Sequence, residues 1–214
     1  MAEREIIDTD VVIVGAGPAG LAAAIRLKQL QPALSVTVVE KAAEVGGHIL
    51  SGAVMDPVGL SELIPDWRQR GAPVGPVVND DRIHLLTPRN DFTIPNWLLP
   101  PLMKTHGGVI TSLGDLVRWL GDEAQALGVD IFPMTAAVDV LDGEGAAIAG
   151  IVTGYLGVDK NGFPKAGHAA GIGIRARRTL IAEGARGSLA KRLIARFGLD
   201  AASSPQKYGL GLKE

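Results

Sequence analysis

Three glycines near the start of the chain have the spacing of a diphosphate-binding loop. They lie in Gly15-Ala16-Gly17-Pro18-Ala19-Gly20, which follows the pattern GxGxxG. In such a loop the first glycine permits a tight turn, the second lets the backbone approach a pyrophosphate, and the third lets a helix pack closely on a strand. The positive N-terminal end of that helix favours an anion. The segment therefore predicts a dinucleotide site at the start of a helix.

A carboxylate follows at the distance that such a site requires. Glu40 lies twenty residues beyond Gly20, where it can accept hydrogen bonds from ribose hydroxyls. An acid at this position disfavours a ribose 2′-phosphate, so NADP is not expected, whereas NAD and FAD both remain open. A βαβ unit that binds no nucleotide is the simpler alternative, because glycine-rich turns are common.

The elements that must position these residues are visible in the hydrophobic pattern. Residues 11–14 form a continuous β-branched run, which is typical of a strand buried on both faces. An Ala- and Leu-rich helical segment runs to about Leu30, and residues 36–39 form a second strand that ends at Glu40. Strand, glycine loop, helix, strand and acid in this order are more specific than the loop alone. The expected fold is α/β and Rossmann-like, with a parallel sheet.

The sequence after Glu40 favours one of the two cofactors. Residues 40–53 read EKAAEVGGHILSGA and contain the glycine pair Gly46-Gly47 one short loop beyond the acid. This arrangement resembles the E-K/R-x(5–6)-G-G segment of glutathione-reductase-like flavoproteins, in which the chain wraps the flavin side of the cofactor. The resemblance favours FAD over NAD.

A second helix and strand are expected in the middle of the chain. Residues 113–127 place apolar side chains on one helical face. Ser112 with Asp115 approximates a capping box, and Gly128 closes the helix. Residues 129–134 then predict another parallel strand. Residues 136–178 contain short strands divided by turns and are interpreted as an inserted β-meander.

A second candidate flavin contact follows this insertion. Residues 179–182 are expected to form a core strand, and residues 183–197 continue as a turn and an amphipathic helix. The junction resembles the D-G-x-x-S-x-x-R motif of the same superfamily, with Glu183-Gly184 in place of Asp-Gly and the Ser and Arg displaced. An ordinary βα turn is the alternative. The basic residues nearby predict a solvated face, with a docking surface for an acidic partner or anionic lipid as the lesser interpretation; they are Arg175, Arg177, Arg178, Arg186, Lys191, Arg192 and Arg196.

Composition limits the classes of site that the chain can hold. The hydrophobic share of 47% and the charged share of 21% are those of a globular core, and the net charge of −2 does not suggest bulk nucleic-acid binding. The sequence contains no cysteine, so these 214 residues cannot supply a disulfide or the thiolate ligands of an iron–sulfur cluster. The longest uncharged run is too short to span a bilayer.

Several longer strings resemble one family, the electron transfer flavoprotein–ubiquinone oxidoreductases. They are VVIVGAGPAGLAAAIRLKQL, LSGAVMDP, ELIPDWRQRGAP, LGDLVRWLGDEAQALGV and YGLGLKE. The resemblance implies a monotopic membrane enzyme that carries FAD and one [4Fe–4S] cluster. Such an enzyme accepts electrons from reduced electron transfer flavoprotein and passes them to ubiquinone.

The departures from this family suggest a portion of a longer enzyme. The cluster ligands and a later glycine-containing flavin segment are not found, so the interpretation is one FAD-binding domain portion over residues 1–214, incomplete at the C-terminus. Within it, residues 1–50 are the dinucleotide-binding βαβ unit. Two alternatives remain: an FAD-dependent reductase of the geranylgeranyl-reductase type, and an incomplete, cofactor-free fragment.

Together the motifs and the resemblance give a set of candidate cofactor-binding residues. They are Gly15, Gly17, Pro18, Ala19, Gly20, Glu40, Lys41, Gly46, Gly47, His48, Ser51, Gly52, Ala53, Ser112, Val138, Glu183 and Gly184. No catalytic side chain and no metal ligand are assigned, because electron transfer through a flavin requires no nucleophile.

Residues 92–104, FTIPNWLLPPLMK, form an apolar segment broken by three prolines. Such a segment either covers a core or forms an apolar surface. Membrane contact is preferred, because a short apolar segment can lie in one leaflet and the family resemblance points the same way. The expected membrane and quinone side comprises Trp97, Leu98, Leu99, Leu102 and Met103. The expected location is the periphery of the bacterial cytoplasmic membrane, with the mitochondrial inner membrane as the alternative.

Overall fold

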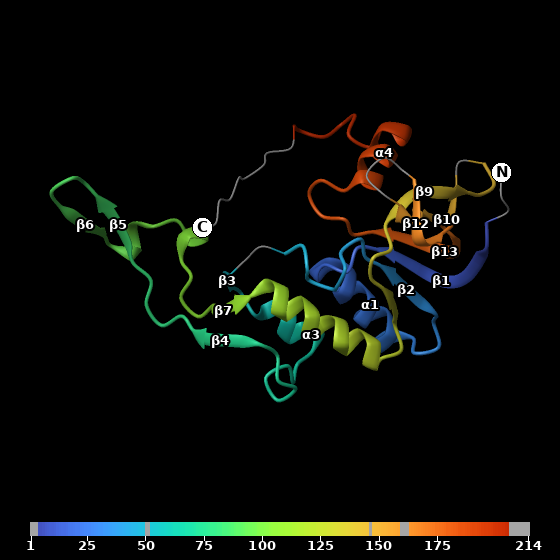
Figure 1. Ribbon diagram of the computed structural model, residues 1–214. Helices are drawn as coiled ribbons and strands as arrows, with labels where there is room; N and C mark the ends of the chain where they lie inside the picture. Colours follow the sequence, from blue (N-terminus) through green and yellow to red (C-terminus); the bar gives the residue numbers. More distant parts are fainter. Residues whose placement is uncertain (1–3, 50–51, 146, 159–162, 206–214) are drawn as a thin grey trace. The chain divides into compact units, whose positions relative to one another are not determined.

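The computed structural model describes residues 4–49, 52–145, 147–158 and 163–205 (Figure 1). The chain divides into two compact units. The first unit comprises Met1–His48 and Val117–Glu214, and the second unit comprises Ile49–Leu116. We describe each unit by itself.

The first unit is built on a six-stranded mixed sheet in the order β8-β2-β1-β13-β10-β9. Its parallel part consists of β8 (Asp130–Phe132), β2 (Val36–Val39), β1 (Ile6–Val14) and β13 (Gly173–Ile181). Two antiparallel strands, β10 (Ile148–Thr153) and β9 (Ala137–Asp142), extend the sheet beyond β13. The predicted Rossmann-like α/β class is confirmed.

The second half of β1 and the whole of β2 are covered by the rest of the unit. Residues 11–14 of β1 and all four residues of β2 are buried, as expected for parallel strands without a solvent face. Helix α1 (Pro18–Leu30) packs on β1 and β2, and helix α4 (Ser188–Phe197) packs on β9. Leu189 and Leu193 of α4 belong to the same buried cluster as residues of β1.

The second unit contains two small antiparallel sheets. A three-stranded sheet has the order β3 (Gly52–Met55), β7 (Val109–Ser112) and β4 (Val74–Val77). A separate two-stranded ribbon is formed by β5 (Ile83–Leu86) and β6 (Asp91–Ile94). Helix α2 (Val58–Leu63) precedes the buried Trp67, whose indole Nε1 donates to Ser61 Oγ over 3.0 Å.

The remaining elements are short turns, one long helix and a second ribbon. Two 3-10 turns, η1 (Asn96–Leu98) and η2 (Pro101–Met103), follow β6. Helix α3 (Leu113–Ala126) starts in the second unit and ends in the first. Strands β11 (Leu156–Val158) and β12 (Pro164–Ala169) form a ribbon in the first unit.

Several local predictions are confirmed by the structure. The second strand has the predicted bounds, and α1 ends at Leu30. The backbone amide of Asp115 donates to Ser112 Oγ over 3.4 Å at the start of α3. Gly128 adopts a φ of +82° just after that helix, a conformation that closes helices and that side chains disfavour. The predicted parallel strand after it is β8.

Two expected boundaries are wrong. The inserted meander does not extend to residue 178, because Gly173–Ile181 is one continuous strand that pairs with β1 from Ile6 to Val14. The segment from residue 92 to 104 does not begin as an irregular loop, because β6 pairs with β5 through Ile94. In the first case pairing with the distant strand β1, and in the second pairing with the neighbouring strand β5, overrides the glycine and proline signals of the local sequence.

Candidate functional site

The parallel strands of the first unit end at a common edge of the sheet, and the strand order reverses beside β1. From β1 the chain passes through α1 to β2 on one side, whereas β13 lies on the other side of β1. In open α/β sheets, ligands bind in the crevice outside the carboxyl ends of the strands at such a switch point. The glycine loop, residues 15–20, leaves β1 at this position.

Gly15 and Gly20 are required because the backbone has no room for a side chain. Gly15 has a φ of +106°, and a Cβ on it would lie 2.5 Å from the carbonyl oxygen of Ala182. A Cβ on Gly20 would lie 2.0 Å from the carbonyl oxygen of Gly15. The Gly15 amide also donates to Val39 O over 2.8 Å, and the Ala182 amide donates to Val14 O over 2.8 Å. The two glycines therefore let the ends of β1, β2 and β13 converge.

Gly17 differs from them, because a Cβ on it would meet no atom within 4 Å. It is the N-cap of α1, has no capping side chain and is followed by Pro18 at the first helical position. Its carbonyl accepts from Leu21 N over 3.0 Å, the first bond of the helix. Helix geometry leaves the amides of Ala19 and Gly20 without an acceptor inside the helix. An open backbone face beside such amides is what an anionic diphosphate needs.

Glu40 is held in place by two backbone amides. Ala16 N donates to its Oε2 over 2.9 Å, and Ala42 N donates to its Oε1 over 2.8 Å. The Glu40 backbone is fixed as well, because its amide donates to Phe132 O over 2.9 Å and its carbonyl accepts from Thr135 N over 2.7 Å. Each carboxylate oxygen can accept a further bond. The carboxylate thus keeps acceptor capacity for the predicted ribose contact, and sequence reasoning missed that it also braces the glycine loop.

The second glycine pair forms a turn in the same unit. Gly46 is buried with a φ of +80°, and Gly47 N donates to Glu44 O over 3.1 Å. Lys41 and His48, which flank this turn, are exposed. These residues follow Glu40 directly, so the structure keeps them near the end of β2, as the sequence pattern implies.

Glu183 has a different task from the one that the motif suggests. Its Oε2 accepts from the amide of Ala190 over 2.7 Å in the first turn of α4. A Cβ on Gly187, the N-cap of α4, would lie 2.4 Å from Glu183 Cβ. The carboxylate therefore caps α4 through one of its oxygens, and its assignment as a cofactor contact stays a prediction. Gly184, with a φ of +77°, makes the turn after β13.

Four further candidates lie elsewhere or outside the described residues. Gly52 pairs with Ser112 in the sheet of the second unit, and Ala53 lies beside Gly52 in the same strand. Val138 belongs to β9, at the edge of the sheet, with β13 and β10 between it and β1. Its carbonyl accepts a hydrogen bond from Arg192, and its assignment as a cofactor contact stays a prediction. Ser51 lies outside the described residues.

The apolar segment of the second unit is exposed at most of the expected positions. Trp97 is 78% exposed, Leu98 57% and Met103 49%, whereas Leu99 is buried at 9%. Leu99 is therefore a core residue of its unit, which corrects its assignment to the membrane side. The side chain of Leu102 lies outside the described part of the structure. The neighbouring ribbon adds exposed Leu85, Leu86 and Phe92, of which sequence reasoning missed the two leucines.

One carboxylate ties the two ends of this exposed segment together. Asp81 Oδ2 accepts from the amide of Thr105 over 2.8 Å, and its Oδ1 accepts from Asn96 Nδ2 over 2.8 Å. The Thr105 amide is the main reason why the pKa of Asp81 lies below its ordinary value, and Thr105 and Asn96 side chains and the charge of His106 act in the same direction. Asp81 thus closes the base of the loop that carries β5, β6 and the 3-10 turns. In the described residues, no helix is both long and apolar enough to cross a bilayer.

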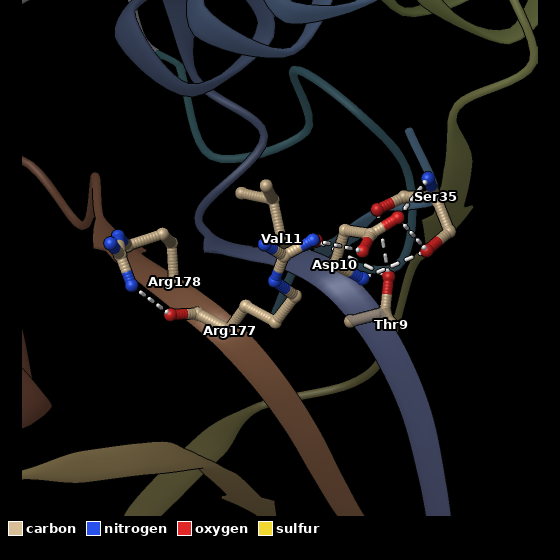
Figure 2. Close-up of polar contacts among 6 residues, drawn as sticks. All are labelled: Thr9, Asp10, Val11, Ser35, Arg177 and Arg178. Carbon is tan, nitrogen blue, oxygen red and sulfur yellow. Dashed lines mark hydrogen bonds and ion pairs between the residues drawn. The ribbon is translucent and has the colours of Figure 1, made fainter. Parts of the chain in front are cut away.

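Most of the predicted basic cluster is paired within the chain. Arg175 lies 3.4 Å from Asp8, and Arg177 lies 3.4 Å from Asp10. Figure 2 shows Asp10 between Arg177 and Ser35, whose backbone amide is the main cause of the lowered pKa of Asp10. Arg192 and Arg196 of α4 pair with Asp139 and Asp142 over 3.2 and 2.8 Å. These pairs favour the solvated face over an anion-docking surface.

Comparison with known proteins agrees with this geometry. The family model for an NAD(P)-binding Rossmann-like domain matches residues 13–64. An electron transfer flavoprotein-ubiquinone oxidoreductase of Pseudomonas aeruginosa is 50% identical over 218 residues, which cover 99% of this chain and 40% of that protein. The human mitochondrial protein of the same name is 48% identical, with 99% of this chain and 35% of that protein covered. This chain is a homologue of the electron transfer flavoprotein–ubiquinone oxidoreductases.

The predicted family resemblance is thereby confirmed, and the chain spans between a third and two fifths of the length of these oxidoreductases. Solved structures are similar in fold. The flavin-dependent monooxygenase PieE matches with a TM-score of 0.61 at 18% identity, over 90% of this chain and 32% of that one. A geranylgeranyl bacteriochlorophyll reductase-like protein from Thermoplasma acidophilum matches with a TM-score of 0.58 at 18% identity, over 83% and 39%.

Proposed function

We propose that the chain is the FAD-binding portion of a membrane-associated flavoprotein that passes electrons from reduced electron transfer flavoprotein to ubiquinone. The chain is 48% to 50% identical to the oxidoreductases that carry this name. The observation that carries the proposal in the structure is the glycine loop, in which Gly15 and Gly20 are closed by backbone and Gly17 is open. The residues present fit the diphosphate and ribose of a dinucleotide.

The chain contributes binding and orientation. The open face of Gly17 and the first amides of α1 would hold the diphosphate, and Glu40 would accept from the adenosine ribose. The bound FAD would supply the redox chemistry, which is to collect electrons from one partner and deliver them in pairs to a quinone. The [4Fe–4S] cluster expected from the family would need thiolates from outside these 214 residues, which contain no cysteine.

The second unit is proposed to contact the membrane and the quinone. Exposed Trp97, Leu98 and Met103 form an apolar surface of a kind that marks an interaction site in soluble proteins. Tryptophan favours the interface between lipid and water, and a segment of this length can lie in one leaflet. The proposed location is the periphery of the bacterial cytoplasmic membrane, with the mitochondrial inner membrane as the alternative.

The geranylgeranyl-reductase alternative has weaker support. Its representative among the solved structures shares 18% sequence identity with the chain, so the similarity extends to the fold alone. The third interpretation, a fragment that binds no cofactor, predicts that the folded chain takes up no FAD.

The proposal is tested by reconstitution with FAD. The purified chain is unfolded, refolded with FAD and separated from free cofactor, and its visible spectrum is recorded beside its circular dichroism. A flavin spectrum that co-elutes with folded protein supports the proposal. A folded protein that takes up no flavin contradicts it and favours the cofactor-free fragment.

Membrane contact is tested by flotation with liposomes. The double variant Trp97→Asp, Leu98→Asp is expected to float less than the wild type while its circular dichroism is unchanged. Leu30→Asp is the matched control, because Leu30 is 69% exposed and lies in the first unit. Loss of the fold in the double variant, or equal loss of flotation in the control, would count against a specific membrane surface.

A further inference from the structure

Two cations of the second unit have no partner in the chain. The unit contains five lysine and arginine residues, which are Arg68, Arg70, Arg82, Arg89 and Lys104. Three of them are engaged by neighbours: Arg68 lies over the ring of Trp67, Arg70 pairs with Asp66, and Arg82 pairs with Asp80. Within the described residues, the side chains of Arg89 and Lys104 make no ion pair, hydrogen bond or ring contact, and both are exposed. These two cations are therefore available to an external anion.

Arg89 and Lys104 flank the exposed apolar residues in the sequence. Arg89 lies in the turn between β5 and β6, which Thr87 N closes by donating to Asn90 O over 2.8 Å. Lys104 is the C-cap of η2. Between them lie the exposed side chains Phe92, Trp97, Leu98 and Met103. Long cationic side chains can lie along an apolar surface with their stems while their charged ends reach water or lipid headgroups.

The β5–β6 ribbon has one face without polar side chains. That face is formed by two cross-strand pairs, Ile83 with Ile94 and Leu85 with Phe92. The opposite face carries the His84–Asp91 pair, whose Nδ1 and Oδ1 atoms lie 2.8 Å apart, together with Thr93 and Leu86. Lipid would therefore take up the first face, and the second would stay toward water.

The carboxylates of the same loop are engaged within the chain. They are Asp80 with Arg82, Asp91 with His84, and Asp81 with the amide of Thr105. Residues 80–104 contain three arginines and lysines and three aspartates, so the loop has little net charge. Attraction of an anion by Arg89 and Lys104 then acts at contact rather than over a long distance.

We propose that Arg89 and Lys104 bind the phosphate groups of anionic phospholipids and that the β5–β6 ribbon lies along the membrane surface. This inference rests on the proposed membrane contact of the second unit. Arginine binds phosphate through two parallel hydrogen bonds, and lysine binds it as a point charge. If the ribbon entered the membrane tip first, its four-residue strands would carry Arg89 about 13 Å inward. A charged side chain is costly at such depth, whereas a ribbon along the surface keeps both cations among the headgroups.

The lipid preference is tested by flotation of the full 214-residue chain with vesicles of phosphatidylcholine alone or mixed with phosphatidylglycerol. We expect the wild type to bind the mixed vesicles more tightly. Arg89→Gln and Lys104→Gln should each weaken binding to the mixed vesicles roughly threefold to fivefold and leave binding to phosphatidylcholine unchanged. Arg70→Gln is the matched control, because it changes the net charge equally but removes an arginine that is paired with Asp66.

The orientation of the ribbon is tested by the depth of a spin label. The chain contains no cysteine, so Asn90→Cys and Phe92→Cys each give one labelled site. The depth of each label in the mixed vesicles is measured from its accessibility to oxygen and to a water-soluble nickel complex. We expect the label at position 90 to lie among the headgroups and the label at position 92 to lie deeper. A deeper label at position 90 than at position 92 would show entry tip first and overturn the orientation.

The outcomes separate the inference from the proposed membrane contact. A folded wild type that floats with neither kind of vesicle overturns both. Equal binding to the two kinds of vesicle, or variants at Arg89 and Lys104 that bind like the wild type, overturns the inference and leaves the membrane contact standing. An equal loss in Arg70→Gln also overturns it, because the preference would then follow the net charge of the chain.

Discussion

Two alanine substitutions in the same glycine loop should have different effects. Gly20→Ala should destabilise the fold, whereas Gly17→Ala should weaken cofactor binding. In Gly20→Ala the new Cβ would lie 2.0 Å from Gly15 O and 3.3 Å from Ala182 Cβ. The nearest atom belongs to the backbone and cannot rotate away, so β1 and α1 must move apart. In Gly17→Ala the new methyl meets no protein atom within 4 Å, and its backbone, at φ −81° and ψ −178°, suits alanine.

The magnitudes follow from these contacts. Overpacking of this kind costs about 1–3 kcal/mol, and we expect about 2 kcal/mol for Gly20→Ala, which lowers Tm by roughly 4–8 °C in a chain of this size. For Gly17→Ala, the loss of a favourable N-cap costs about 0.5 kcal/mol, and the reduced entropy of the unfolded chain returns about as much. Its Tm should therefore stay within about 2 °C of the wild type.

At Gly17 we expect a large effect on FAD affinity, although the effect on stability is small. The Gly17→Ala methyl occupies the face that the diphosphate approaches, and we expect FAD affinity to fall at least about tenfold, or about 1.4 kcal/mol. Thermal unfolding followed by circular dichroism gives Tm, and calorimetric titration with FAD gives the affinity. Wild-type affinity in Gly17→Ala would refute the placement of the diphosphate, and a wild-type Tm in Gly20→Ala would refute the close packing.

Three further predictions concern single side chains. Because the pKa of Asp81 is lowered in the folded state, its contribution to stability is present above about pH 3.8, the ordinary value, and is lost as pH falls through the folded value. The protection of the Thr105 amide against hydrogen exchange, relative to its intrinsic rate at each pH, should therefore fall on acidification in the wild type and be low at all pH in Asp81→Ala. Lys28→Met should destabilise the first unit by about 2–3 kcal/mol, because the buried Lys28 Nζ donates to Pro32 O over 2.7 Å and to Leu34 O over 2.9 Å. Urea unfolding measures the change, and an unchanged midpoint would show that water replaces the Lys28 ammonium as the donor to these two carbonyls. Glu183→Ala should cost about 1 kcal/mol as a lost helix cap with FAD affinity preserved, whereas a large affinity loss at constant Tm would show that Glu183 contacts the cofactor.

The part of the fold that sequence reasoning located best is the part with local causes. Each of these features depends on residues within about thirty positions of it in the sequence: the buried run in β1, the glycines of the loop, the apolar face of α1, and Glu40. The sequence predicts a tight turn at Gly15. The atom that excludes a side chain there is the carbonyl oxygen of Ala182, which lies far away in the sequence. Such pairings depend on which strand becomes the neighbour of β1.

The errors have the same origin. Leu99 is apolar and sits between exposed residues, and only the packing of its unit decides that it points inward. For Glu183 the sequence suggests only a cofactor motif, and the hydrogen bond from Ala190 of the following helix was not foreseen. In the β5–β6 ribbon, β6 alternates polar and apolar side chains, but Leu85 and Leu86 of β5 are both exposed on opposite faces, so the pattern alone could not assign one apolar face.

The two hydrogen bonds that the Glu40 carboxylate accepts have a consequence for how such a protein can evolve. Its carboxylate accepts from Ala16 N and Ala42 N, and under the proposed function it would also accept from the adenosine ribose, so one side chain would both select the cofactor and support the loop that binds it. A substitution that admits a 2′-phosphate, such as Glu40→Arg, would replace two acceptors with donors facing two amides. A change of cofactor preference at this position therefore cannot arise by a single neutral step; the loop would have to acquire other acceptors first. Under the proposed function, the choice of nucleotide and the support of the glycine loop would therefore depend on the same side chain.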